Sequence, residues 1–259
     1  MTCAVYAFVA GLGACLGSFL NVVIYRLPLD KSIIRPGSSC PKCEQPIKWY
    51  DNIPIFSYLI LHARCRNCKT KIAIRYPLVE TTAMILSLVA FHIYGLSLEI
   101  IPALIMSLGM VAVAFIDYDH MIIPDELSIG GTVAGILLAL LPGGVSPIDA
   151  IIGALVGGAG LWLVRWVHMK ISGIEGMGLG DVKLACAIGA FLGWFALPVV
   201  LFLSSMLGLL VGGTAILVRK KNARTPMPFG TFLALGSIFD VLFGDKLRAM
   251  FMQLAVLYN

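Results

Sequence analysis

Long apolar segments alternate with short polar ones along nearly the whole chain. Each apolar segment is long enough, or nearly long enough, to cross the hydrocarbon core of a membrane as a helix. We predict eight such helices, at about 4–25, 78–95, 100–116, 127–141, 148–167, 182–196, 197–218 and 228–244. The separation of the sixth helix from the seventh depends on the break Trp194-Phe195-Ala196-Leu197-Pro198, so seven helices is the alternative.

The composition agrees with this pattern. Of 259 residues, 59% are hydrophobic and only 13% are charged, and the mean hydropathy is +0.93. These values exclude an ordinary soluble domain and make membrane lipid the principal surroundings of the chain. The predicted fold class is therefore an all-α polytopic membrane protein.

The distribution of basic residues predicts the orientation in the membrane. No basic residue precedes the first apolar segment, and positive charges begin only at Arg26, so this segment is expected to be a retained helix with its N-terminus outside. Alternation then places loops 26–77, 117–126, 168–181 and 219–227 inside; with their flanks they hold 17 of the 19 Lys and Arg residues. The net charge of +5 is thus an orientation signal, and no nucleic-acid partner is expected.

One loop is large enough to form a small domain. Residues 26–77 contain two Cys-x2-Cys pairs, Cys40 with Cys43 and Cys65 with Cys68. Two such pairs provide the four thiolates of a tetrahedral zinc site, which would supply folding free energy rather than chemistry. Disulfides or a redox-active pair are the alternative, but the expected cytosolic location opposes them. We therefore predict a small, zinc-ribbon-like cytosolic insert with structural zinc.

The candidate catalytic groups are carboxyls at the inner ends of helices. Asp117 is expected to end the third helix and Asp181 to begin the sixth, so both can lie in one plane near the cytosolic interface. Two neighbouring carboxyls divide their roles as in an aspartic protease, because one keeps a proton while the other takes a proton from water. Gly178 and Gly180 would let a substrate strand approach Asp181 closely. The alternative is that Asp181 only caps a helix.

The loop between these helices also carries acids. Asp125 follows Pro124 and is expected to be the N-cap of the fourth helix, and loop 117–126 contains no Lys or Arg. Rival functions are a membrane ion or proton transporter using the paired carboxylates, and a membrane thiol oxidoreductase using the cysteine pairs.

Several motifs in one order resemble the bacterial type IV prepilin peptidases over nearly the whole chain. They are GSFLNVVIYRLP (17–28), CPKC and CRNC with NIPIFSYL (52–59), RYPLVE (75–80), FIDYDHMIIPD (115–125) and GMGLGDVK (176–183). One departure is visible, because His62 and Ala63 stand where the family commonly has a basic residue and a glycine.

The resemblance implies an inner-membrane aspartic endopeptidase. It would remove the basic leader of type IV prepilins or pseudopilins after a glycine, on the cytosolic side, with Asp117 and Asp181 as the catalytic pair. It also implies that the new amino terminus is methylated using S-adenosylmethionine. The sequence has no strand followed by a glycine-rich turn and a helix, so no cofactor-binding residues are assigned. The expected divisions are a first transmembrane helix (1–25), a zinc-binding domain (26–77) and a transmembrane peptidase domain (78–259).

Overall fold

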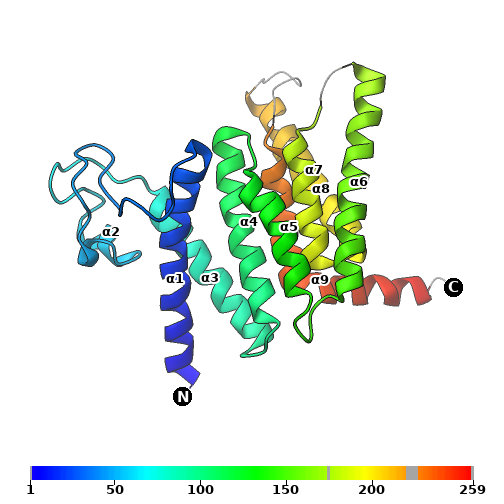
Figure 1. Cartoon of the computed structure of the whole chain (residues 1–259), viewed down its shortest axis with the longest axis horizontal. Helices are drawn as coiled ribbons and strands as arrows, with labels where there is room; N and C mark the ends of the chain where they lie inside the picture. Colours follow the sequence, from blue (N-terminus) through cyan, green and yellow to red (C-terminus); the bar gives the residue numbers. More distant parts are fainter. Residues whose placement is uncertain (1, 174–175, 220–226, 258–259) are drawn as a thin grey trace. The chain divides into compact units, whose positions relative to one another are not determined.

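The computed structural model describes residues 2–173, 176–219 and 227–257. The long helices follow the predicted apolar segments: α1 (Thr2–Arg26), α3 (Arg75–Tyr94), α4 (Ile100–His120), α5 (Asp125–Leu138), α6 (Pro147–Ser172), α7 (Leu179–Leu192), α8 (Leu197–Arg219) and α9 (Phe229–Leu257) (Figure 1). A short helix, α2 (Phe56–Ile60), belongs to the insert. Within the described residues, pairing of extended backbone is limited to two isolated bridges, also in the insert. The all-α prediction is confirmed.

The helix lengths support a membrane protein but do not confirm eight spans. Among the residues that the structure describes, five helices are long and apolar enough to cross a membrane: Cys3–Leu29, Arg75–Tyr94, Ile100–His120, Pro147–Ser172 and Trp194–Thr214. A further apolar segment, Phe229–Gly244, is shorter. Helices α5 and α7 have only 14 residues each. The predicted break before α8 is present, because Gly193 ends α7 with a φ of 77° and a turn of 3-10 helix follows.

The chain forms two compact units, residues 1–96 and 97–259. The first unit contains the insert and the two helices that flank it, α1 and α3. These helices pack closely because Gly13 and Gly17 face α3: a Cβ at Gly17 would lie 2.6 Å from Cα of Glu80, and one at Gly13 would lie 2.7 Å from Cβ of Ser87. Two glycines four positions apart are a common way for membrane helices to pack closely.

Helices α7 and α9 make most of the helix–helix contacts in the second unit. Helix α7 packs against α5 and α6, helix α9 packs against α4 and α8, and α7 also contacts α9. Gly153 on α6 and Gly189 on α7 meet backbone to backbone, because a Cβ on either would collide with the carbonyl group of the other. This arrangement brings the end of α4 and the starts of α7 and α9 together.

The chain reversals place the polar ends of these helices on one side of the second unit. Figure 1 shows the end of α4 and the starts of α5, α7 and α9 at the same end of the unit. Asp117 and Asp181 therefore lie at this end of the unit, and the adjoining core contains fully buried apolar side chains such as Ile116, Leu184 and Leu233.

Candidate active site and metal centre

Asp117 is held at the start of another helix. It lies in the last turn of α4 and is buried, with 4% of its surface exposed. Its Oδ2 atom accepts a hydrogen bond of 2.7 Å from the backbone N–H of Thr231, in the first turn of α9. The Thr231 hydroxyl lies 3.2 Å from the same oxygen and 3.1 Å from the carbonyl oxygen of Ala114. The unpaired N–H groups at the start of a helix favour a negative charge, so α9 is oriented to stabilise an Asp117 carboxylate.

Asp181 occupies the third position of α7 and is also buried. Gly178 is the N-cap of this helix, and its N–H donates to the carboxyl of Asp181. This is one half of a capping box. Asp181 is therefore not the N-cap that the alternative interpretation assumed, although its carboxyl does accept one hydrogen bond at the start of the helix.

The structure places the two carboxyls at the same end of the second unit, near enough for the charge of Asp117 to act on Asp181. The side chain of Ile123 lies between the two helix starts, because it would contact a Cβ at Gly180 at 3.2 Å and one at Gly230 at 2.6 Å. A Cβ at Gly230 would also lie 3.0 Å from Oδ2 of Asp117. Glycine at position 230 thus allows α9 to begin directly against the carboxylate.

The two predicted substrate-approach glycines have different surroundings. At Gly180, the Ile123 side chain occupies the space beside the backbone, so the missing side chain lets the segment before α5 pack against α7. At Gly178, the nearest atoms to an added Cβ would be Oδ2 of Asp181 at 3.6 Å and the Gly180 nitrogen at 3.8 Å. Free space beside the Asp181 carboxyl therefore lies at Gly178 rather than at Gly180.

One expectation about the acidic loop is wrong. Asp125 is not an N-cap: Pro124 holds that position, and no side chain caps α5. Asp125 instead accepts a hydrogen bond of 2.7 Å from Nζ of Lys183 on α7, forming an ion pair between largely exposed side chains. The loop itself contains no Lys or Arg, and its neighbouring positive charge comes from Lys183, 58 positions further along the chain. The pair joins the starts of α5 and α7.

Sequence reasoning missed Thr231 because it makes its contact to Asp117 from 114 positions away. The sequence Pro228-Phe229-Gly230-Thr231 carries a helix-start signal, with proline before the first turn and a hydroxyl residue in it. That signal predicts the beginning of α9. It does not predict which buried group the free N–H groups at this beginning will contact.

The four predicted cysteine ligands form one cluster in the first unit. The sulfur atoms of Cys40, Cys43, Cys65 and Cys68 all lie within 4.8 Å of one another. The Sγ atoms of Cys40 and Cys68 are 3.8 Å apart. A zinc tetrahedron with Zn–S bonds of about 2.3 Å has sulfur–sulfur edges of about 3.8 Å, whereas a disulfide bond is about 2.05 Å long. The donor set and its spacing therefore fit a tetrahedral metal ion.

The two cysteine turns are built alike. The N–H of the first cysteine in each turn donates to the carbonyl oxygen five residues later, that of Gln45 for Cys40 and that of Thr70 for Cys65. The carbonyl oxygen of the same cysteine accepts a hydrogen bond from the N–H four residues later. The backbone N–H groups of Cys43 and Lys42 point toward the Cys40 sulfur and lower the pKa of that thiol. A turn that stabilises the thiolate favours metal binding at neutral pH.

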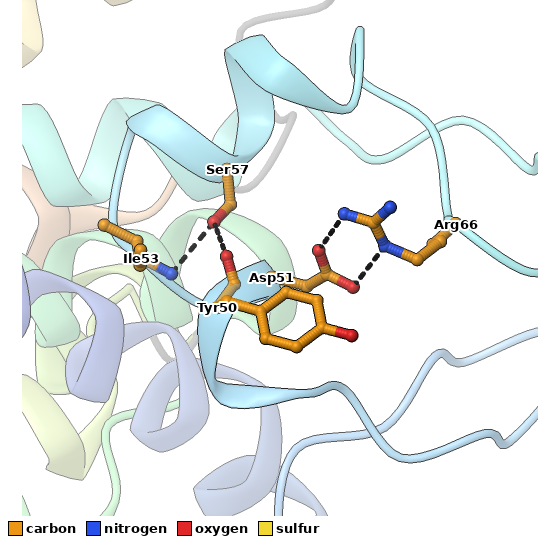
Figure 2. A network of polar contacts seen from close by, with 5 residues as sticks. All are labelled: Tyr50, Asp51, Ile53, Ser57 and Arg66. Carbon is orange, nitrogen blue, oxygen red and sulfur yellow. Dashed lines mark hydrogen bonds and ion pairs between the residues drawn. The ribbon is translucent and has the colours of Figure 1, made fainter.

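A polar network holds the loop between the two cysteine turns. The Asp51 carboxylate accepts hydrogen bonds of 2.7 and 2.6 Å from Nε and Nη2 of Arg66 (Figure 2). The Ser57 hydroxyl donates to the carbonyl oxygen of Tyr50 at 3.0 Å and accepts from the N–H of Ile53 at 2.9 Å. These contacts order a segment that has only short helical turns of its own.

Comparisons with known proteins agree over both units. The family model described as the bacterial peptidase A24 N-terminal domain matches residues 12–94, and the model described as the type IV leader peptidase family matches residues 104–213. The first match contains all four cysteines and the second contains Asp117 and Asp181. No solved structure matches the chain.

Relatives named prepilin leader peptidase/N-methyltransferase share much of the sequence. One from Pseudomonas putida is 40% identical over 265 residues, which cover 94% of this chain and 92% of the relative. One from Aeromonas hydrophila is 39% identical, covering 92% of this chain and 90% of the relative. One from Myxococcus xanthus is 46% identical over 81% of this chain and 62% of the relative. The chain therefore belongs to the type IV leader peptidase family.

Proposed function

We propose that this chain is a membrane-embedded aspartic endopeptidase that removes the basic leader of type IV prepilins or pseudopilins after a glycine, and that it also methylates the new amino terminus. The observation that carries the peptidase is that two buried carboxyls, Asp117 at the end of α4 and Asp181 at the start of α7, lie near enough for one charge to act on the other. Membership of the family and the names of the relatives support the substrate and the second activity.

The hydrogen bonds suggest how the two carboxyls divide the work. Asp117 accepts from both the N–H and the hydroxyl of Thr231, whereas Asp181 accepts from the N–H of Gly178. More donors favour the ionised form, so we assign the negative charge to Asp117 and the retained proton to Asp181. Asp117 is then the general base that activates water, and Asp181 is the acid that faces the substrate carbonyl.

The hydrolysis follows from this assignment. The water oxygen attacks the peptide carbonyl carbon, its proton passes to Asp117, and Asp181 gives its proton to the carbonyl oxygen. The tetrahedral intermediate then breaks its C–N bond as the leaving nitrogen takes a proton from Asp117. The hydroxyl proton returns to Asp181 as the carbonyl re-forms, so one water is consumed and both side chains recover their starting states.

Substrate approach is proposed along the start of α7. The space beside Gly178 adjoins the Asp181 carboxyl, so an unwound substrate strand would enter there, while Gly180 keeps the segment before α5 close. Asp119, Asp125 and Glu126 are exposed beside this site. Exposed acids raise the local concentration of a positively charged leader.

We propose that the cysteine cluster holds a structural zinc ion. Zinc would replace the hydrophobic core that the insert, residues 26–77, is too small to form. Most side chains of the insert are exposed, which supports this view. In the proposed division of the chain, α1 precedes the insert and the peptidase domain, residues 78–259, follows it. The insert would then have a function separate from peptide cleavage.

The proposed orientation places the N-terminus outside, with the insert and the carboxyl pair at the cytosolic face of the bacterial inner membrane. It depends on the 17 basic residues of the inside loops and their flanks. The proposed partners are the prepilin substrate and membrane lipid.

S-adenosylmethionine is the methyl donor we propose for the second activity. When bound, it supplies a methyl group on a positively charged sulfur: the amine nitrogen forms the new N–C bond, the S–C bond breaks, and the amine loses one proton. The printed names of the relatives are the support for this activity. The alternative of an ion transporter receives no support from those names.

The test of the peptidase is mass spectrometry of a type IV prepilin incubated with purified protein in detergent. Wild type is expected to cleave after the leader glycine, and Asp117→Asn and Asp181→Asn are expected to leave the prepilin intact although both remain folded. Addition of S-adenosylmethionine should add about 14 Da to the cleaved product, the mass of one methyl group replacing a proton. Normal cleavage by both variants would refute the mechanism.

A further inference from the structure

A cavity of about 460 Å³ lies within the first unit, lined by residues of the insert, the end of α1 and the start of α3. Its volume is in the range of pockets that hold small cofactors, about 300–1,000 Å³. The peptidase mechanism does not use it, because Asp117 and Asp181 belong to the second unit. Its lining combines two carboxylates, Asp51 and Glu80, with aromatic rings and with four basic side chains, those of Arg26, Lys48, Arg66 and Lys71. It therefore suits a ligand that carries both a positive and a negative charge, as the sulfonium and the carboxylate of an S-adenosylated amino acid do.

Glu80 is the most unusual group in this cavity. It lies in the second turn of α3, is buried with 8% of its surface exposed, and lines the cavity. Its Oε2 atom accepts a hydrogen bond of 2.7 Å from the N–H of Ile55, and the Ser18 hydroxyl is its other partner. Neither partner carries a charge. A buried carboxylate in such a place is stabilised most by a ligand that brings a positive charge.

The backbone that contacts Glu80 is held in a strained turn. Ile55 has a φ of 64° and a ψ of −53°, and the N–H of Phe56 donates to the carbonyl oxygen of Pro54 at 2.6 Å. This geometry is the rare form of a three-residue turn, and a β-branched residue adopts it only when its surroundings impose it. The turn directs the Ile55 N–H at Glu80 and so fixes how the carboxylate faces the cavity.

The other walls suit a nucleoside. Tyr25, Tyr58 and Tyr76 line the cavity and offer aromatic faces against which a purine can stack. Asp51 also lines the cavity. Each of its carboxylate oxygens accepts one hydrogen bond from Arg66 (Figure 2). Because a carboxylate has about four acceptor directions, Asp51 can still accept from sugar hydroxyl groups.

We propose that this cavity binds S-adenosylmethionine, with the Glu80 carboxylate facing its positively charged sulfur and the tyrosine faces holding its adenine ring. The proposal depends on the proposed methyltransferase function and names its cofactor site. S-adenosylmethionine joins a fixed positive charge to an adenosine, and the cavity offers a partner for each. The same reasoning assigns the insert a task beyond holding its metal ion.

The test compares two ligands that differ in charge. S-adenosylhomocysteine has a neutral sulfur, so a carboxylate that faces the sulfur distinguishes it from S-adenosylmethionine. Isothermal titration calorimetry would measure both dissociation constants with the zinc-loaded, full-length protein in detergent. Wild type should bind S-adenosylmethionine more tightly. Glu80→Gln keeps an oxygen for the Ile55 N–H but removes the charge, so it should bind S-adenosylmethionine at least about tenfold more weakly and S-adenosylhomocysteine almost unchanged.

Glu44→Gln is the matched control, because Glu44 is an exposed acid of the same insert and does not line the cavity. It should bind both ligands as wild type does. Equal affinities of wild type and Glu80→Gln for S-adenosylmethionine would overturn the proposal. If wild type bound neither ligand yet cleaved prepilin, the methyltransferase function itself would fall while the peptidase stood.

A second measurement does not depend on Glu80→Gln folding correctly. Ultraviolet irradiation of wild type with S-adenosylmethionine labelled in its adenine ring would attach the label to the aromatic side chains that contact the ring, which peptide mass spectrometry would locate. Label on Tyr25, Tyr58 or Tyr76 supports the proposal, and label confined to residues 97–259 overturns it. Zinc content and thermal unfolding would show whether Glu80→Gln is folded.

Discussion

Thr231 provides a sharp test of the proposed active site, because it contacts Asp117 by two separate groups. Replacing it with valine keeps the shape of the side chain and the backbone N–H, whose hydrogen bond to Oδ2 of Asp117 is 2.7 Å long. Only the hydroxyl is lost, which lies 3.2 Å from that oxygen. The change therefore removes one donor from the proposed base without opening a cavity.

The structure allows the size of the effect to be worked out. A hydrogen bond to a charged group contributes about 1.5–3 kcal/mol. The Thr231 hydroxyl is shared with the carbonyl of Ala114 at 3.1 Å, so the lower end applies, about 1.5 kcal/mol. That free energy corresponds to about a tenfold change in rate. Because Thr231 orients Asp117 rather than binding substrate, the loss should fall on kcat and leave KM nearly unchanged.

The assay is the initial rate of prepilin cleavage by wild type, Thr231→Val and Thr231→Ser over a range of substrate concentrations. Serine keeps the hydroxyl, so it should recover most of the rate. Thr214→Val is the matched control, since Thr214 is an exposed residue of α8 whose hydroxyl donates to its own helix at 2.9 Å. A wild-type kcat for Thr231→Val, or a serine variant as slow as the valine variant, would refute the reasoning.

Three further predictions concern the insert. Ala63 has a φ of 57°, so Ala63→Gly should raise the unfolding free energy by about 0.5–1 kcal/mol, measured by chemical denaturation; an unchanged midpoint would contradict it. A strong chelator should remove about one zinc ion per chain and make residues 26–77 sensitive to limited proteolysis, and protection without metal would count against structural zinc. Arg66 lowers the pKa of Asp51, so wild type should exceed Asp51→Asn in unfolding free energy, and this difference should be largest at neutral pH. It should vanish as the pH falls through that lowered pKa, and thermal melts across the acid range would detect a difference that persisted.

The sequence predicts the helices well, because an apolar run in lipid has few alternatives to a helix. The runs match α1 and α3–α8 to within about five residues at each end, whereas α9 continues to Leu257, beyond the predicted end at 244. The break before α8, predicted at residues 194–198, is present but begins at Gly193. The number of membrane spans is not confirmed, since a run of apolar residues does not reveal how many of them a helix will include. Helices α5 and α7 stop after 14 residues.

The candidate site shows the same division between local and distant information. Regular spacing predicts the cysteine cluster, because two tight turns each carry their own ligands, and the four sulfurs do meet. The contacts of Thr231 with Asp117 and of Lys183 with Asp125 depend on how helices pack. Spacing along the chain carries no record of such packing. The cavity around Glu80 was missed for a similar reason, since its walls come from three separate segments.

The short length of α5 and α7 has a consequence for the membrane itself. A helix of 14 residues is about 21 Å long, whereas the hydrocarbon core is about 30 Å thick. If these neighbouring helices cross the bilayer, they are about 9 Å shorter than the hydrocarbon core is thick. The bilayer must then become thinner around them. Asp181 at the start of α7 would then lie at the bottom of a dimple filled by water. Hydrolysis needs that water, and the end of a substrate helix entering the dimple would lose the lipid that favours its helical form.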